Sequence, residues 1–368
     1  MSRRGVLISL GAAGVAAVVA TAALVSISDG EPKPAGQALG HNGMVTGTVW
    51  VANEDGASLT AIDAGQNKVV TTLTGIESPH NVQVSPDDGT LWAVSGTESL
   101  AVMVDAKTLG LLGTVRTGRM PAHVVVSPDG ETAYTTNGAD NTVSAIDTTT
   151  MKPVATIPVG SGPHGLRPSP DGKWVYVANI TGTTLSVIDT TTNKKVAEVE
   201  VGQSPAQVAF SPDGRFVYAS LNGENALAKV DVATRTLVGK VEVGVGPIQT
   251  YVSPDNRYLL VANQGTEDKP STTVSILETK TFTVLRTVQT GEGAHGIVID
   301  PSSRHAYITN MYGNDVAVLD LKLLEVVARI PVGAKPNGVG FSTVTLSSRP
   351  TTKIELPMND EGGAEMSH

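Results

Sequence analysis

The sequence predicts an all-β protein, a seven-bladed β-propeller built from four-stranded antiparallel blades. The main observation is an internal repeat, in which a proline follows the same kind of apolar strand at spacings of 42, 42, 42, 42 and 47 residues: Pro86, Pro128, Pro170, Pro212, Pro254 and Pro301. One propeller blade takes about 40 to 45 residues. Helix-forming runs are nearly absent after the first 30 residues, and Val, Thr, Ala and Gly are abundant. Because neighbouring blades share a core, we expect one folded domain in the 368 residues.

The first 28 residues have the features of an export signal or a membrane anchor. Arg3 and Arg4 precede an uncharged run, 5–28, which contains an Ala-x-Ala cleavage motif at 20–22. Residues 2–7 also resemble a twin-arginine signal. We therefore expect an exported protein that is extracellular, periplasmic or attached to the cell envelope. It would contact a membrane only through this segment, if the segment is not cleaved.

Each repeat has the same internal order. An apolar strand leads into a Ser-Pro-Asp-Gly turn, as at 211–214, and a second strand ends in Asn. Proline, aspartate and glycine each favour a tight turn, so the first two strands should form a hairpin. The third strand ends in an acidic residue seven times, which predicts seven blades: Asp63, Asp105, Asp147, Asp189, Asp231, Glu278 and Asp320. We expect these carboxylates to stabilise turns rather than to catalyse.

The second strands carry a recurring four-residue motif: Trp50–Asn53, Tyr134–Asn137, Tyr176–Asn179, Leu260–Asn263 and Tyr307–Asn310. In motif, order and period the chain resembles the YVTN family of seven-bladed β-propellers. The likeness covers about 45–345, with Ser95 and Leu221 as departures at the Asn position. A five-residue insertion within 264–273 predicts a longer loop on one face.

The ends of the repeat array predict how the ring closes. Residues 48–74 supply only three strands, whereas 337–342 form a leading strand with no blade after it. The last strand should therefore complete the first blade, which removes both free edges. The expected divisions are an export signal or anchor (1–28), a linker (29–43), the propeller (44–345) and a C-terminal tail (346–368), which begins with some apolar alternation and which we expect to be disordered beyond Pro357.

Candidate site residues come from aligning the loops that enter the innermost strands, since these loops converge on the propeller axis. Six residues before each turn proline, or its equivalent, stand His80, Ala122, His164, Ala206, Ile248, His295 and Asn337. Three of the seven histidines in the chain thus share one position. His123 follows one residue later, from where it could point to a different side. The predicted ligand-binding residues are His80, His123, His164, His295, Asn337, Arg167, Gln207 and Gln249.

Three kinds of role are open for these histidines. His80, His164 and His295 could hold a transition metal such as copper, iron or zinc, they could bind an anion when protonated, or they could brace their loops. No cofactor is required by the sequence. The absence of cysteine excludes disulfides and thiolate metal sites. A net charge of −9 and a pI of about 5.3 argue against a nucleic-acid partner.

The function that we expect is an exported or envelope-tethered binding scaffold of the YVTN family. Its ligand, a small molecule or an envelope protein, would contact the axial loop face, and we expect a monomer. The first alternative is a metal-dependent copper or iron redox enzyme that uses the axial histidines. The second is a propeller lactonase or lyase, for which the entry loops offer only Glu77 and Glu292 as acidic partners. Whether the protein is an enzyme stays open at this point.

Overall fold

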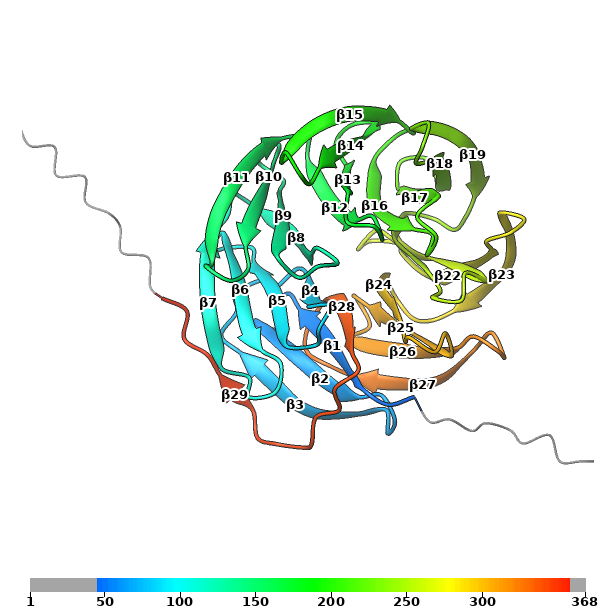
Figure 1. Ribbon diagram of the computed structural model, residues 1–368. Helices are drawn as coiled ribbons and strands as arrows, with labels where there is room; N and C mark the ends of the chain where they lie inside the picture. The colour runs from blue at the N-terminus through cyan, green and yellow to red at the C-terminus, as the bar shows by residue number, and fades with distance from the viewer. Residues whose placement is uncertain (1–44, 358–368) are drawn as a thin grey trace, which may run out of the picture. The chain divides into compact units, whose positions relative to one another are not determined.

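The computed structural model describes residues 45–357, in which 29 strands form seven sheets. Six sheets have four strands and one has five. Figure 1 shows the sheets arranged as blades around a central axis, with one strand of each sheet nearest the axis and another at the rim. The predicted seven-bladed propeller is confirmed.

The strands fall into four concentric sets. The innermost strands are β4 (Val82–Val84), β8 (Pro121–Val126), β12 (Pro163–Pro168), β16 (Pro205–Phe210), β20 (Pro247–Val252), β24 (Ala294–Ile299) and β28 (Pro336–Ser342). The second strands are β1 (Thr48–Asn53), β5 (Thr90–Ser95), β9 (Thr132–Asn137), β13 (Trp174–Asn179), β17 (Phe216–Leu221), β21 (Tyr258–Gly265) and β25 (His305–Asn310). The third strands are β2 (Ser58–Asp63), β6 (Leu100–Asp105), β10 (Thr142–Asp147), β14 (Thr184–Asp189), β18 (Ala226–Asp231), β22 (Pro270–Glu278) and β26 (Asp315–Asp320). The rim strands are β3 (Lys68–Thr74), β7 (Leu111–Arg116), β11 (Lys152–Pro158), β15 (Lys194–Glu200), β19 (Thr236–Glu242), β23 (Thr283–Gln289) and β27 (Glu325–Pro331).

Ring closure follows the predicted route. The last inner strand, β28, pairs antiparallel with β1, with Val51 opposite Val339. The first blade therefore contains strands from both ends of the described chain. A short strand, β29 (Thr352–Lys353), then adds in parallel to the rim strand β3 of the same blade. Figure 1 shows this segment crossing outside β3.

Residues 346–357, the first part of the predicted C-terminal tail, pack against the first blades. Leu346 and Ile354 are buried in the apolar core shared by the first two blades. The segment covers apolar surface at the rim of the first blade. Removing that surface and its own apolar side chains from water favours packing over exposure to solvent. The expected export signal (1–28), the linker (29–43) and the last part of the tail (358–368) lie outside the described residues. Among residues 45–357 there is no helix that is long and apolar enough to span a membrane.

One blade shows why the repeated residues are needed. In the β12–β13 turn, Ser169 Oγ donates to Asp171 Oδ1 at 2.6 Å and accepts from the backbone N–H of Trp174 at 3.0 Å. At the other end of β13, Asn179 Nδ2 donates to two hydroxyls of the next strand. The acidic residue at the end of each third strand likewise accepts a turn hydrogen bond, in all seven blades. The predicted turn role of these carboxylates is confirmed.

Large aromatic side chains fill the spaces between blades. The third residue of the second strand is aromatic in six blades, and each is at most 1 % exposed: Trp50, Trp92, Tyr134, Tyr176, Tyr218 and Tyr307. Trp92 packs with residues of its own and the following blade, such as Ala101 and Val124. Burial of such rings stabilises the contact between neighbouring sheets, so each blade is held mainly by the next one.

Candidate metal centre

The innermost strands begin with a bulge that controls where their side chains point. In β12 the register with β13 shifts between Pro163 and Leu166, and in β20 the register with β21 shifts between Pro247 and Thr250. In a regular strand, residues three apart face opposite sides. The extra residue of a bulge changes this alternation. His164 and Arg167 can therefore both face the propeller axis, although three positions separate them.

Hydroxyl groups tie these bulges to the next blade. Thr136 Oγ1 accepts from the backbone N–H of His123 at 3.1 Å and donates to the carbonyl of His164, one blade further round, at 2.7 Å. The same pair of bonds is made by Ser220, between Gln207 and Ile248, and by Thr309, between Gly296 and Asn337. The backbone that carries the site is thus held across blade boundaries as well as within blades.

Four histidines converge at this end of the axis. The ring centroid of His80 lies 5.2 Å from that of His164, 5.5 Å from that of His123 and 5.9 Å from that of His295. The His123 and His164 rings are 4.9 Å apart. His80, His123 and His164 each offer one ring nitrogen within 4.8 Å of the others. The structure therefore brings together all three histidines of the shared position and adds His123, whose direction the sequence left open.

Hydrogen bonds determine which ring nitrogens carry protons. His164 Nδ1 lies 2.9 Å from the carbonyl of Ala206, which can only accept, so His164 is protonated at Nδ1. Its Nε2 then has a lone pair, 3.2 Å from His80 Nε2. The Asn337 amide nitrogen lies 2.9 Å from His80 Nδ1 and donates to Glu54 Oε2 at 2.7 Å. Its two hydrogens can serve both acceptors, so a neutral His80 carries its proton on Nε2, whereas a protonated His80 can also donate from Nδ1 to Glu54.

Glu54 is part of the site, although it is not among the site residues predicted from the sequence. It follows β1, and its Oε2 lies 3.5 Å from His80 Nδ1. Burial alone would raise the pKa of Glu54, but the hydrogen bond and charge of His80, with the Asn337 amide and Lys335, lower it to about 2. A carboxylate therefore persists beside the histidines at any ordinary pH. A signal was available in the sequence, since Glu54 is the one acidic residue directly after the second-strand motif among the seven repeats.

Burial keeps most of the imidazoles neutral. It is the main cause that lowers the pKa of His164 to about 4, with the charge of His80 adding to it. Burial, followed by the neighbouring histidines, also lowers the pKa of His123 and of His295 well below the ordinary value. Neutral imidazoles offer lone pairs to a cation, whereas an anion would need them protonated. Of the roles that the sequence left open, this environment favours metal binding over anion binding.

Several buried polar atoms of the cluster have no hydrogen-bond partner within the part of the chain that the structure describes. Both ring nitrogens of His123 are unpartnered, and that side chain is fully buried. Nδ1 of His295 is also unpartnered. An unsatisfied buried donor or acceptor costs about 1–3 kcal/mol. These atoms lie beside the His80–His164 pair. A ligand bound there could supply the partners that they lack.

The other predicted residues lie at different places along the axis. Gln207 and Gln249 are buried, and the Nε2 atom of each lacks a partner. Gln207 fills the space that a side chain at Gly165 would need, since a Cβ there would lie 2.3 Å from its Oε1. Asn337 contacts His80 as described above. Arg167 instead lines a cavity nearer the Ser-Pro-Asp-Gly turns, among the second halves of the inner strands.

The acidic residues expected to support lactonase or lyase chemistry are not placed for it. Glu77 and Glu292 are both exposed, and the carboxylate that contacts a histidine of the cluster is Glu54. The 264–273 insertion extends the β21–β22 hairpin at the histidine end, where Gln264 Nε2 donates to the hydroxyl of Tyr312 at 3.3 Å. The predicted longer loop is therefore present, as an extended hairpin.

Solved structures with a similar fold differ in their chemistry. A chain of Kuenenia stuttgartiensis hydrazine synthase is 25 % identical over 72 % of this chain and 90 % of that one, with a TM-score of 0.67. The dihydro-heme d1 dehydrogenase NirN is 15 % identical over 80 % of this chain and 74 % of that one, with a TM-score of 0.60. A putative 6-phosphogluconolactonase from Bacteroides fragilis is 16 % identical over 81 % and 98 %, with a TM-score of 0.68. The last two show the fold alone.

A search of curated proteins finds no match to this chain. A protein-family model does match it. The model describes a YNCE-like β-propeller and covers residues 131–225 and 211–353, which together make up more than half of the 368 residues. With the seven closed blades and the repeated second-strand motif, this match shows that the chain belongs to the YNCE-like β-propeller family.

Proposed function

We propose that this protein is an exported β-propeller binding protein whose ligand is a transition-metal ion, held by His80, His123 and His164. The observation that carries the proposal is the unpaired, fully buried imidazole of His123 beside two further ring nitrogens. Export is inferred from the twin-arginine-like segment at the N-terminus.

The spacing of the ring nitrogens supports a metal. Two imidazole ligands of a tetrahedral zinc ion, each at 2.0–2.1 Å, have nitrogens about 3.4 Å apart. Nε2 of His80 and Nε2 of His164 are 3.2 Å apart. A short movement of either ring would accommodate an ion between them. His123, within 4.8 Å of both, would supply a third ligand. Imidazole ligands suit zinc, copper, iron and nickel, so the proposal is for an ion of this class.

The surrounding groups support the same reading. A metal-binding histidine usually donates its other N–H to a carbonyl or carboxylate. His164 already does so through Ala206. His80 would move its proton from Nε2 to Nδ1, and the Asn337 amide would then no longer donate to Nδ1. Glu54 Oε2, 3.5 Å away, can accept the Nδ1 proton. The charge of Glu54 would also offset part of the charge of the ion.

Access favours binding from the loop face. The side chain of His80 is 20 % exposed, whereas His123 is fully buried. An ion from solvent can therefore contact His80 and His164 first. It would then bind His123, which lies deeper. The fold itself does not choose an activity, because the similar structures carry the names of a synthase, a dehydrogenase and a putative lactonase. The proposal is for metal binding, and it includes no redox or hydrolytic step.

The test is metal content and metal affinity. Protein exported by its own signal is expected to contain one equivalent of copper, zinc, iron or nickel by elemental analysis. EDTA-treated protein is titrated with Zn²⁺ and Cu²⁺ by calorimetry. For whichever of the two ions binds more tightly, His80→Ala and His164→Ala should each lower the affinity at least tenfold. His305→Gln is the matched control, since His305 stands at the start of β25 beside Asp320. Equal affinity in all these proteins, or no stoichiometric binding to the wild type, would overturn the proposal.

A further inference from the structure

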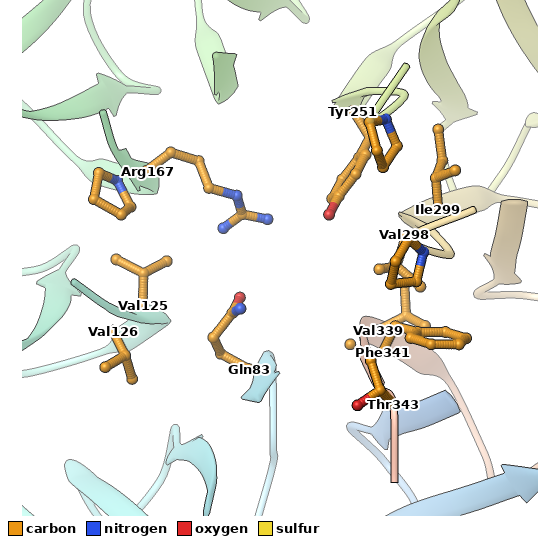
Figure 2. A pocket seen from close by; sticks show the side chains of 14 residues that line it. Gln83, Val125, Val126, Arg167, Tyr251, Val298, Ile299, Val339, Phe341 and Thr343 are labelled. Carbon is orange, nitrogen blue, oxygen red and sulfur yellow. The ribbon is translucent and has the colours of Figure 1, made fainter. Parts of the chain in front are cut away.

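We infer that the other end of the axis holds a second site, at which Arg167 binds a small organic carboxylate. The site is a cavity of about 390 Å³, lined by the second halves of inner strands from several blades. Figure 2 shows the guanidinium of Arg167 pointing into the cavity, with Gln83 beside it and Tyr251 on the facing wall. This site does not depend on the proposed metal site.

The repeat places the second site apart from the histidine cluster. Gln83, Arg167 and Tyr251 each lie three residues after the shared position that holds His80 and His164. At about 3.3 Å of rise per residue, three residues correspond to about 10 Å along a strand. The equivalent residues of other blades include Val125, Ala209 and Val298. Arg167 is thus a charged replacement at a position that other blades fill with apolar side chains.

Arg167 has no anionic partner among residues 45–357. Its Nη1 donates to the carbonyl of Leu166 at 3.1 Å, which is a neutral acceptor. Among the described residues, no carboxylate lies within 4.0 Å of the guanidinium. Burial lowers the pKa of Arg167, but an arginine still remains charged at ordinary pH. The chain has 35 acidic and 26 basic residues, so this unpaired cation does not arise from a shortage of carboxylates.

The remaining lining determines the kind of anion. The Tyr251 hydroxyl and the Gln83 amide can add hydrogen bonds, and burial raises the pKa of Tyr251, so its phenol stays a donor. The walls are otherwise largely apolar: Val125, Val126, Val298, Ile299, Val339 and Phe341. A planar guanidinium matches the two oxygens of a carboxylate. The combination fits a carboxylate with an apolar body, and the volume is that of a small-ligand pocket.

The experiment compares acids with their amides. Protein that has been treated with EDTA and then dialysed free of it is titrated with benzoate and hexanoate, and with benzamide and hexanamide as neutral analogues of the same shape. The treatment removes any metal, so the outcome is separate from that of the metal titration, and no EDTA carboxylate remains to compete. The carboxylates should bind saturably and at least tenfold more tightly than the amides. Arg167→Val, which installs the residue present at Val125 and Val298, should abolish this difference.

Two further variants keep the result interpretable. Arg257→Gln removes an exposed arginine from the β20–β21 turn near the cavity and should leave carboxylate affinity unchanged. Tyr251→Phe should lower the affinity for the carboxylates a few-fold. Thermal melts should show that all variants are folded. Equal affinity for acid and amide, or unchanged affinity in folded Arg167→Val, would overturn the inference. Tighter binding of inorganic phosphate than of either acid would overturn the assignment to carboxylates.

Discussion

Nε2 of His80 and Nε2 of His164 lie 3.2 Å apart, although 84 residues separate them in the chain. His80 lies just before β4 and His164 lies near the start of β12, an inner strand two blades away, and the propeller brings both strands to its axis. A hydrogen bond of this kind needs one ring to hold a proton that the other lacks. The contact therefore depends on the protonation of both rings and on the positions of both blades, and it lies where the proposed metal ion would bind.

Acid should destabilise the metal-free protein through the buried histidines. The pKa of His164 is lowered from 6.5 to about 4 in the folded state. Between these pH values the unfolded chain binds a proton that the folded chain does not, so the free energy of unfolding falls as the pH falls. The share of His164 is about 2 to 3 kcal/mol between pH 7 and pH 4. Urea denaturation in EDTA at several pH values measures it.

The comparison for this pH effect is His164→Gln. The variant lacks the titrating group, so its stability should fall less between pH 7 and pH 4 than that of the wild type. Carboxylates titrate in both proteins, and their contribution cancels in the difference. An identical loss of stability in both proteins would contradict the prediction.

Glu54→Gln should weaken metal binding by about 10- to 100-fold. The glutamine removes the charge that would offset that of the ion, and it is a poorer acceptor for the Nδ1–H that His80 would carry in the metal-bound form. Calorimetric titration with Zn²⁺ measures the change. Glu77→Gln, at an exposed glutamate of a neighbouring loop, is the control and should bind as the wild type does. If both variants lose the same affinity, a general loss of negative charge rather than the Glu54 contact is responsible.

Thr136→Val should destabilise the fold by about 1–3 kcal/mol, although the two side chains have similar shapes. It removes the hydroxyl that bonds the His123 N–H and the His164 carbonyl, and leaves both groups buried without that partner. Chemical denaturation measures the loss. The exposed Thr191 provides the control, and Thr191→Val should change stability by no more than about 0.5 kcal/mol. Equal effects at the two positions would show that the bond between blades contributes little.

Ile354→Ala should lower the free energy of unfolding by about 2–4 kcal/mol. Ile354 is 6 % exposed and packs into the core of the first two blades. Leu323→Ala is the control, since Leu323 is 56 % exposed on the β26–β27 turn. Urea unfolding of both variants tests whether residues 346–357 belong to the folded unit. An Ile354→Ala protein as stable as the wild type would show that this segment does not contribute to the core.

The fold could be predicted from the sequence because the same strand and turn signals recur in every repeat, so that a weak signal in one repeat is supported by the others. A single Ser-Pro-Asp-Gly turn is weak evidence, but the same turn at a constant period aligns every strand and even identifies β28 as the missing strand of the first blade. The same period placed His80, His164 and His295 at one level of the axis. Residues that obey the repeat are therefore predictable, and so is the closure of the ring.

The rest of the site arises where side chains depart from the repeat. His123 joins the cluster because the bulge at the start of β8 and the bond to Thr136 set its direction, and a period in sequence carries no information about direction. Glu54 reaches His80 from the neighbouring blade, since it follows β1 while His80 precedes β4. The packing of Ile354 likewise depends on a rim surface that appears only after the blades have formed.

Because the ring is closed by its last strand, the histidine site can be completed only late in the synthesis of the chain. Asn337 belongs to the last inner strand, yet its amide joins Glu54, which follows the first described strand, to His80. A ribosome therefore has to deliver almost all of the described chain before these three groups can meet. A partly made or C-terminally shortened chain would therefore lack the Asn337 contact that joins Glu54 to His80.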